Sequence, residues 1–211
     1  MLTLYGAPGS GAAAIEGALI LIGLPYRGVE AAAWLPGPGV EELKRVNPLG
    51  QIPTLLLEDG SVVSESAAIL IHLGLAYPEA GLLPAATTER TQAIRGLVYI
   101  AANCYAAIGV IDYPGRWCAE CDETTAKRIR TGARARVHQL WTAFADTFAP
   151  HPFLSGARLG GLDLLAAVVS RWSGARGHLA KERPALHAHL AAIDNEPRLV
   201  ALFNRHWPPK A

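Results

Sequence analysis

Over its first 76 residues the chain alternates short runs typical of strands with longer apolar runs typical of helices, and glycines and prolines separate them. We predict strands over residues 2–5, 25–31, 54–58 and 61–63, and helices over residues 12–23, 40–46 and 64–76. Gly23 suits the end of the first helix, because glycine readily adopts the left-handed conformation found there. Asp59-Gly60 between two apolar runs predicts a hairpin. The helix between the first two strands predicts that they pair in parallel.

Beyond residue 88 the pattern predicts helices and no convincing strand. These helices are expected over about 89–110, 125–148, 161–175, 184–194 and 197–205. The stretch before them contains Gly81 and Pro84 and has the composition of a linker. We therefore expect an α/β domain followed by an all-α domain. The order of elements in the first is that of a thioredoxin-like domain over residues 1–78, and a linker over 79–88 leads to an all-helical domain over 89–211.

Composition narrows the class of protein. The chain has 211 residues, of which 51% are hydrophobic and 18% charged, with a net charge of +1, which is typical of a folded protein with a well-buried core. No basic run suggests nucleic acid. The apolar run from Ala12 to Leu24 is too short to span a membrane and lacks the basic start of a signal peptide. Three cysteines, an odd number, favour a reducing cytoplasm.

The most informative stretch is Asn47-Pro48-Leu49-Gly50-Gln51-Ile52-Pro53-Thr54-Leu55, which is followed by Glu65-Ser66 at the start of an apolar helix. Pro53 cannot donate to a sheet ladder, and the bond before a proline is the one that is readily cis. A bend there leaves the backbone N–H and C=O of Ile52 available to a ligand. A helix N-terminus holds anions through its spare N–H groups and its dipole. Together these features predict a site for an extended, peptide-like ligand that is anionic at one end.

In this order and spacing, the two motifs resemble the cytosolic glutathione transferase family. The opening stretch from Leu2 to Ser10 is similar to the first strand and active-site loop of bacterial-type, serine-class members, and Gly161-Leu162-Asp163-Leu164-Leu165 is similar to the start of a C-terminal helix of the family. The resemblance covers essentially the whole chain. It implies glutathione as co-substrate, no metal, a hydrophobic electrophile as second substrate, a homodimer, and a role in detoxification.

For glutathione itself, the resemblance assigns Glu65 to the ammonium and Ser66 to the carboxylate of the γ-glutamyl end. Ile52, before Pro53, would pair with the cysteine backbone as a short added strand. Gln51 is the nearest donor for the glycine carboxylate. The alternative for the second motif is ordinary helix capping, since its residue types favour a first turn.

Where family members often have histidine or lysine for the glycine carboxylate, this chain has Gly50-Gln51, and Lys44 or Arg45 could compensate.

Two hydroxyls compete to activate the thiol. Ser10 precedes the first helix, where a hydroxyl assisted by the helix dipole can favour a thiolate. Tyr5 ends the first strand, where tyrosine classes of the family carry their catalytic residue. The alternatives are a helix cap for Ser10 and a packed strand residue for Tyr5, so the pattern also allows that neither is catalytic. No cysteine lies near Gly11, which disfavours a covalent mixed-disulfide mechanism there.

The second substrate is expected between the domains. Tyr99 and Asn103 share a face of the first long helix, and Trp117 follows in a stretch that could cover the cleft. The alternative is that all three simply pack. Cys118 and Cys121 form a CxxC pair without the further ligands that a zinc site needs, so we interpret them as incidental thiols, with peroxide or disulfide chemistry as the alternative.

Asp163, with Gly160 at the cap position, forms half of a capping box, and its role is predicted to be structural.

The resulting prediction is a glutathione S-transferase that activates the thiolate for attack on a hydrophobic electrophile. The alternatives are a glutathione-dependent peroxidase or disulfide reductase that uses the same site, and a non-catalytic glutathione- or ligand-binding protein.

Overall fold

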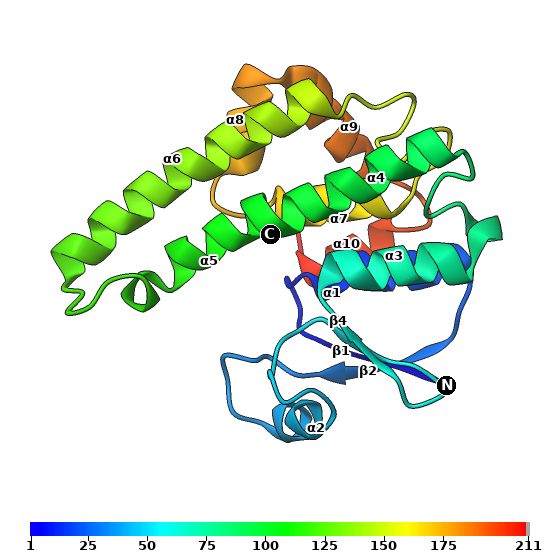
Figure 1. Ribbon diagram of the computed structural model, residues 1–211, viewed down its shortest axis with the longest axis horizontal. Coiled ribbons are helices and arrows are strands. Elements are labelled where there is room, and N and C mark those ends of the chain that lie inside the picture. The colour runs from blue at the N-terminus through cyan, green and yellow to red at the C-terminus, as the bar shows by residue number, and fades with distance from the viewer. Residues whose placement is uncertain (210–211) are drawn as a thin grey trace.

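The computed structural model describes residues 1–209, which form a thioredoxin-like domain followed by a helical region (Figure 1). The first part contains β1 (Leu2–Gly6), α1 (Ala12–Ile22), β2 (Tyr26–Glu30), α2 (Pro38–Val46), β3 (Thr54–Leu56), β4 (Val62–Ser64) and α3 (Ser66–Ala76). The rest contains α4 (Thr87–Tyr99), α5 (Ala106–Asp112), α6 (Glu123–Thr147), α7 (Gly161–Val169), α8 (Ala175–Glu182), α9 (Pro184–Asp194) and α10 (Val200–His206). A π-helical turn, Ile100–Tyr105, joins α4 to α5 without a break, and 3₁₀ turns lie at Pro78–Ala80 and Pro114–Arg116.

The four strands form one sheet in the order β2-β1-β3-β4. The parallel pairing of β1 with β2 and the β3–β4 hairpin are as predicted. Side chains alternate across β1, so Leu2 and Leu4 belong to the main core, while Tyr5 belongs to a small cluster with Val40 and Leu43 of α2. The sheet therefore lies between α1 and α3 on one face and α2 on the other, as Figure 1 shows.

Helix α7 is the centre of the helical region, and all nine of its residues are buried. It contacts α1 and α3 of the first domain as well as α4 and α9, so it joins the two parts of the core. The structure ends this helix at Val169, earlier than the predicted residue 175, and adds α8, which the pattern did not predict. Ser173 and Gly174 both have positive φ, and a left-handed pair of residues cannot continue a helix.

Asp163 lies at the first turn of α7 and is fully buried. Its carboxylate accepts backbone N–H groups from Leu154 (2.8 Å), Ser155 (3.1 Å) and Gly160 (3.1 Å), and His189 Nε2 lies 2.8 Å away. The bond from Gly160 is the predicted half of the capping box. The others tie the loop before α7, and α9 beside it, to the same carboxylate, which fits the predicted structural role.

The continuous helix from Thr87 to Asp112 is long and apolar enough, by length and composition alone, to cross a membrane. Core packing requires the same composition, since Leu97, Ile100 and Cys104 on this helix are buried in the main core. The helix runs beside α6, and the two project together from the body of the protein (Figure 1).

Candidate functional site

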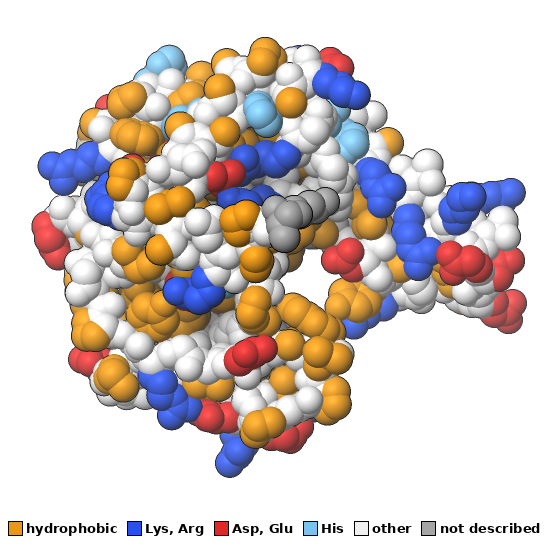
Figure 2. Space-filling model, turned by 180° about the vertical axis from the view of Figure 1, so that it is seen from behind, with side chains coloured by type: hydrophobic (Ala, Val, Ile, Leu, Met, Phe, Trp, Pro, Cys, Tyr) orange, Lys and Arg blue, Asp and Glu red, His pale blue; other side chains and the backbone are white. Residues whose placement is uncertain are grey.

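A cavity of about 650 Å³, here called the main cavity, lies between the thioredoxin-like domain and the helical region. The first domain contributes residues 49–53 with Glu65 and Ser66, and the helical region contributes Tyr105, Ile108, Asp112, Tyr113 and Arg116. Figure 2 shows a deep notch between the body of the protein and the projecting ends of α5 and α6, with hydrophobic side chains on both rims. The two sequence motifs are therefore brought together on one wall of one cavity.

The loop before β3 is held by two buried polar side chains. Asn47 Nδ2 donates to Thr54 Oγ1 (2.9 Å), Thr54 Oγ1 donates to the Gln51 carbonyl (2.7 Å), and Asn47 Oδ1 accepts from the Leu49 N–H (3.1 Å). The Ile52–Pro53 bond is cis. Among the described residues, the backbone of Ile52 has no hydrogen-bond partner, although only Pro53 separates it from β3. The N–H and C=O of Ile52 are therefore unpaired, like those of an edge strand, on a residue that lines the cavity.

The second motif begins α3. Glu65 has φ of 70° and ψ of 116°, a conformation that costs a non-glycine residue about 1–3 kcal/mol. No side chain caps the helix, so the capping alternative is not what the geometry shows. Ser66 is buried at 7% exposure, while its side chain still lines the cavity together with Glu65. A carboxylate and a hydroxyl therefore face the cavity beside the spare N–H groups of a helix N-terminus.

Ser10 lies at the N-terminus of α1, where its hydroxyl is fully engaged. Its Oγ donates to the Ala7 carbonyl (2.7 Å) and accepts from the backbone N–H groups of Ala7 and Ala12 (3.3 Å each). This is the local pattern that stabilises a turn before a helix.

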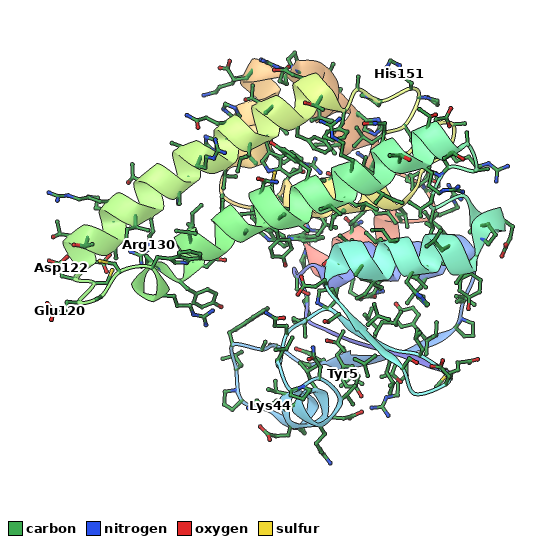
Figure 3. All side chains as sticks on the ribbon, viewed as in Figure 1. Tyr5, Lys44, Glu120, Asp122, Arg130 and His151 are labelled. Atoms are coloured by element: carbon green, nitrogen blue, oxygen red, sulfur yellow. The ribbon has the colours of Figure 1, made fainter. Side chains whose placement is uncertain are left out.

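Tyr5 lies away from the cavity. Its ring is 1% exposed on the α2 face of the sheet, and its hydroxyl donates to Glu42 (3.0 Å) (Figure 3). Burial, together with this carboxylate, raises its pKa. The packed-strand alternative therefore describes Tyr5, and the structure does not bring it to the site.

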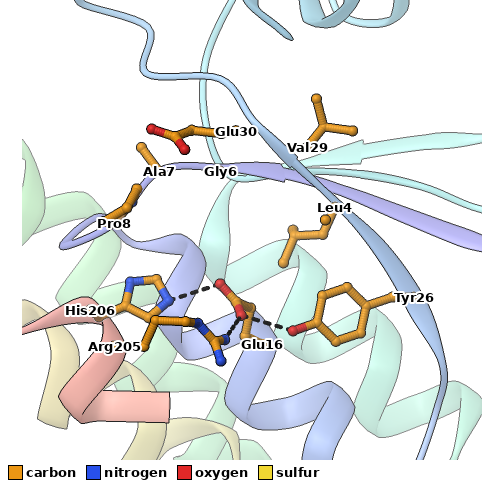
Figure 4. Close-up of a pocket in the computed structure, with 11 residues that line it drawn as sticks. Leu4, Gly6, Ala7, Pro8, Glu16, Tyr26, Val29, Glu30, Arg205 and His206 are labelled. Carbon is orange, nitrogen blue, oxygen red and sulfur yellow. Dashed lines mark hydrogen bonds and ion pairs between the residues drawn. The ribbon is translucent and has the colours of Figure 1, made fainter.

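The loop that carries Ser10 is tied to the C-terminal helix. The Gly9 N–H donates to His206 Nδ1 (3.1 Å), so His206 carries its proton on Nε2, which lies 2.8 Å from Glu16. Glu16 also accepts from the Tyr26 hydroxyl (2.8 Å) and pairs with Arg205 (Figure 4). Burial raises the pKa of Glu16, but the hydrogen bonds from His206 and Tyr26 outweigh it and hold that pKa below its usual value.

These charged groups border a separate cavity of about 480 Å³, which lies beside β2 and contains none of the predicted site residues.

The residues predicted for the second substrate lie outside these cavities. The Tyr99 hydroxyl donates to the Leu140 carbonyl (3.0 Å), and its ring packs against Phe144 and Phe148. Asn103 donates to the Tyr99 carbonyl (3.1 Å), and Trp117 is 66% exposed beyond the rim. Tyr99 therefore lies on the helix that lines the main cavity through Tyr105 and Ile108, but its side chain packs inside the helical region.

An aromatic cavity of about 480 Å³ adjoins the main cavity at this point. Its lining includes Trp34, Tyr105, Tyr113 and Trp172, together with Ser10 and Asp112. Burial raises the pKa of Asp112. The two cavities share part of their lining, so a ligand in one can contact a ligand in the other.

Comparison with known proteins is consistent with this geometry. Residues 13–75 match the sequence profile of the glutathione S-transferase N-terminal domain. The uncharacterized GST-like protein YncG of Escherichia coli K12 is 28% identical over 207 residues, which cover 98% of each chain. The chain is thus similar over its whole length to proteins of the glutathione transferase family.

Solved structures of the family share its architecture. A glutathione transferase from Methylococcus capsulatus strain Bath superposes with a TM-score of 0.75 at 27% identity and 98% coverage of each chain. A glutathione transferase homologue from Sulfitobacter, solved with bound glutathione, superposes with a TM-score of 0.81 at 24% identity and 96% coverage of each chain.

Among the residues that line the candidate site, sequence reasoning missed Tyr105. The residue lies at the end of the π-helical turn and lines both the main and the aromatic cavity. A π turn shifts the helical register, so counting by ordinary helix spacing from Tyr99 does not reach the cavity-facing positions. No local motif surrounds Tyr105. The sequence therefore carried no signal for Tyr105, whose position depends on a π turn that only the structure shows.

The remaining predicted groups have separate positions. Gln51 lines the main cavity, whereas Lys44 pairs with Glu41 (3.4 Å) and Arg45 bonds the Glu41 carbonyl (3.1 Å), both outside the main cavity. Arg116 is the cation that the helical region adds to the cavity lining, and it stacks over Tyr113 at 4.1 Å.

Cys118 and Cys121 lie at the projecting tip before α6, near the labelled Glu120 and Asp122 in Figure 3. Within residues 1–209, histidine, cysteine, aspartate and glutamate side chains form no cluster of three that could hold a metal ion.

Proposed function

We propose that this protein binds glutathione in the main cavity and transfers it, through its thiolate, to a hydrophobic electrophile. The observation that carries the proposal is the meeting of Ile52, Glu65 and Ser66 on one wall of the cavity. Glutathione is an extended γ-glutamyl tripeptide, and these groups match its backbone, its ammonium and its terminal carboxylate. The bound glutathione of the Sulfitobacter homologue adds support, because the two folds superpose closely.

Binding would proceed as β-augmentation at a single residue. The free N–H and C=O of Ile52 would pair with the cysteine backbone of glutathione. Glu65 would accept the ammonium, while the hydroxyl and N–H of Ser66, helped by the dipole of α3, would hold the carboxylate. Gln51 would donate to the glycine carboxylate, and Arg116 on the opposite wall would supply the long-range positive charge that the first domain lacks there.

The chemical step forms a bond between sulfur and carbon. The thiol first loses its proton to solvent, and the thiolate then attacks the electrophile by addition or by displacement of a leaving group. A free thiol has a pKa of about 8.5, so lowering it by about two units requires roughly 2.7 kcal/mol of preferential stabilisation of the thiolate. The N-terminus of α1 faces this region and favours the anion. The aromatic cavity, lined by Trp34, Tyr113 and Trp172, would hold the electrophile.

The family likeness further supports a homodimer and a cytoplasmic location. We propose both. Sedimentation of the purified chain tests the first, and fractionation of cells producing it tests the second.

The test of the function uses three ligands and the wild-type protein. Calorimetry should detect binding of glutathione and of S-methylglutathione, but not of cysteinylglycine, which lacks the γ-glutamyl group. Conjugation should then be measured against a panel of aromatic and alkyl electrophiles, with peroxide and disulfide substrates assayed in parallel. Absence of glutathione binding would overturn the proposal. Binding with turnover of disulfides alone would replace transfer by reduction, and binding without any turnover would leave a ligand-binding protein.

A further inference from the structure

Ser10, one of the two hydroxyls that the sequence offered for thiol activation, has no hydrogen to spare. Ser10 Oγ is 2.7 Å from the Ala7 carbonyl, to which it donates, and two backbone N–H groups occupy its lone pairs. Redirecting that hydrogen to a sulfur would leave the buried carbonyl of Ala7 without this partner. Ser10 is therefore equipped to shape the loop before α1 rather than to stabilise a thiolate.

A second hydroxyl reaches the same helix terminus from the opposite wall. The position that a Cβ on Gly11 would occupy is 3.0 Å from Tyr105 Oη, 3.1 Å from Ser66 Oγ and 3.5 Å from Pro53 Cδ. The phenol oxygen, Ser66 Oγ and Pro53 Cδ therefore all surround the start of α1, which places Tyr105 beside both motifs. Among residues 1–209, the Tyr105 hydroxyl accepts a hydrogen bond from the Gly11 N–H but donates to no side chain or carbonyl, so its proton is available to a ligand.

Tyr105 also lies where the two cavities meet. It lines the main cavity, which holds the glutathione motifs, and the aromatic cavity, which holds the side chains suited to an electrophile. A bond between the sulfur of a ligand in the first cavity and the electrophilic carbon of a ligand in the second would form at this boundary.

We propose that Tyr105 is the catalytic hydroxyl of this protein: it donates the hydrogen bond that holds the glutathione sulfur as a thiolate, facing the aromatic cavity. This inference rests on the proposed glutathione site and adds to it the group that acts on the sulfur. The thiol proton leaves to solvent, Tyr105 keeps its own proton throughout, and the sulfur forms its new bond to the electrophile.

The surroundings of Tyr105 keep it a donor. Burial, with the carboxylates of Asp112 and Glu65, raises its pKa to about 12, and a backbone hydrogen bond from Gly11 only partly opposes them. At neutral pH the phenol therefore remains protonated. The carboxylates of Asp112 and Glu65 also disfavour a nearby thiolate, whereas Arg116 in the cavity lining favours it. Because these charges partly cancel, the hydrogen bond from Tyr105 is the contact that selectively stabilises the thiolate.

The ring of Tyr105 is held in place before any ligand binds. It packs edge-on against Trp172, with centroids 5.3 Å apart and an interplanar angle of 65°. A phenylalanine would keep this ring contact, so Tyr105→Phe removes the hydroxyl and leaves the packing of the ring unchanged.

The test is a pH titration of the ultraviolet thiolate absorbance of bound glutathione in wild type, Tyr105→Phe and Ser10→Ala. We expect Tyr105→Phe to raise the pKa of the bound thiol by about one to two units, the size expected for a lost hydrogen bond to a charged group. Its rate of conjugation at neutral pH should fall by about ten- to a hundredfold, and more weakly as the pH rises. Binding of S-methylglutathione, which has no ionisable thiol, should stay within about twofold of wild type.

Tyr99→Phe is the matched control, because it removes a tyrosine hydroxyl from the same continuous helix. That hydroxyl donates to the Leu140 carbonyl and does not face the cavity. It should leave the thiol pKa unchanged. A depressed thiol pKa that survives Tyr105→Phe, or that is lost in Ser10→Ala instead, overturns the inference while the proposed function stands. Failure of wild type to bind S-methylglutathione overturns the proposed function itself. Thermal unfolding and S-methylglutathione binding establish that each variant is folded before its titration is interpreted.

Discussion

The two walls of the main cavity are built on different principles. The wall from the thioredoxin-like domain presents backbone groups and short polar side chains at element ends, namely Ile52, Glu65 and Ser66. The wall from the helical region presents large side chains, Tyr105 and Tyr113 among them, whose positions depend on how helices pack. The first wall binds through backbone groups, so it suits one ligand with a constant peptide backbone. The second wall binds through side chains, so a single substitution can change which ligands it accepts. The difference suggests that the first wall determines which co-substrate binds and the second determines what it reacts with.

The largest expected effect comes from removing the support of the helical wall. Asp163→Ala would leave three buried N–H groups, including those of Leu154 and Gly160, without their acceptor, and His189 without its partner. We expect a loss of about 3–5 kcal/mol in the free energy of unfolding, measured by urea denaturation. Asp163→Asn keeps one acceptor oxygen and should lose less. A loss below about 1 kcal/mol for Asp163→Ala would contradict the role assigned to this carboxylate.

The next effect is on the other wall and should spare the fold. Glu65→Gln removes the charge that we assign to the ammonium of glutathione. Because Glu65 is exposed, solvent weakens the pair, and we expect the dissociation constant for glutathione to rise by about tenfold. Ser66→Ala should act in the same direction.

Glu58→Gln is the matched control for this prediction, since Glu58 is an exposed carboxylate of the same domain that pairs with the N-terminus at 2.8 Å. Equal affinities in Glu65→Gln and wild type would remove Glu65 from the proposed ligand geometry. The unfolding free energy should be unchanged, which separates this effect from that of Asp163.

The same contrast between walls explains what the sequence could predict. The strands, the parallel β1–β2 pair, the hairpin and the placement of the motifs on one wall follow from local signals such as Asp59-Gly60 and Ile52-Pro53. These signals are short because the chemistry of the first wall is carried by consecutive residues.

The residues that the helical region contributes to the main and aromatic cavities gave no such signal. Tyr105 is displaced by a π turn, and Trp172 lies in a break, before Gly174, that interrupts a helix predicted to be continuous. Tyr99 and Tyr105 lie on the same helical run, but only packing decides which one meets the cavity. The sequence placed Tyr5 at the end of a strand, but it did not say which face of the sheet α2 covers.

A smaller effect is expected within the aromatic cavity. Trp172→Leu removes a ring that lines this cavity without lining the main one, together with its edge contact to Tyr105. An aromatic contact contributes about 0.5–1.5 kcal/mol, so we expect KM for an aromatic electrophile to rise about three- to tenfold. The dissociation constant for S-methylglutathione should stay within about twofold.

Trp117→Leu is the control, because Trp117 is exposed outside the cavities. If Trp117→Leu raised KM more than Trp172→Leu did, the second substrate would lie toward the rim, where the sequence alone had placed it.

The smallest effect is expected from substituting the cysteines. This prediction tests whether the reacting thiol is that of glutathione or that of a protein cysteine. Cys104 is fully buried, and burial raises its pKa to about 12, so its thiol is unreactive at neutral pH. Cys118 and Cys121 line neither the main nor the aromatic cavity. Burial, and then the neighbouring Cys118 thiol, raise the pKa of Cys121, which further lowers its thiolate fraction. We therefore expect Cys118→Ser with Cys121→Ser to change the rate of conjugation by less than about twofold.

Disulfide reduction by the same double variant is the sharper measurement. A transferase whose only reactive sulfur is that of bound glutathione has no protein disulfide to form, so any reductase side activity should survive loss of the pair. Loss of that activity, with conjugation intact, would give the projecting tip a redox role separate from both walls of the cavity. Loss of both activities would mean that the tip reaches the bound thiol during turnover. The tip would then be a third surface of the site, in addition to the two walls.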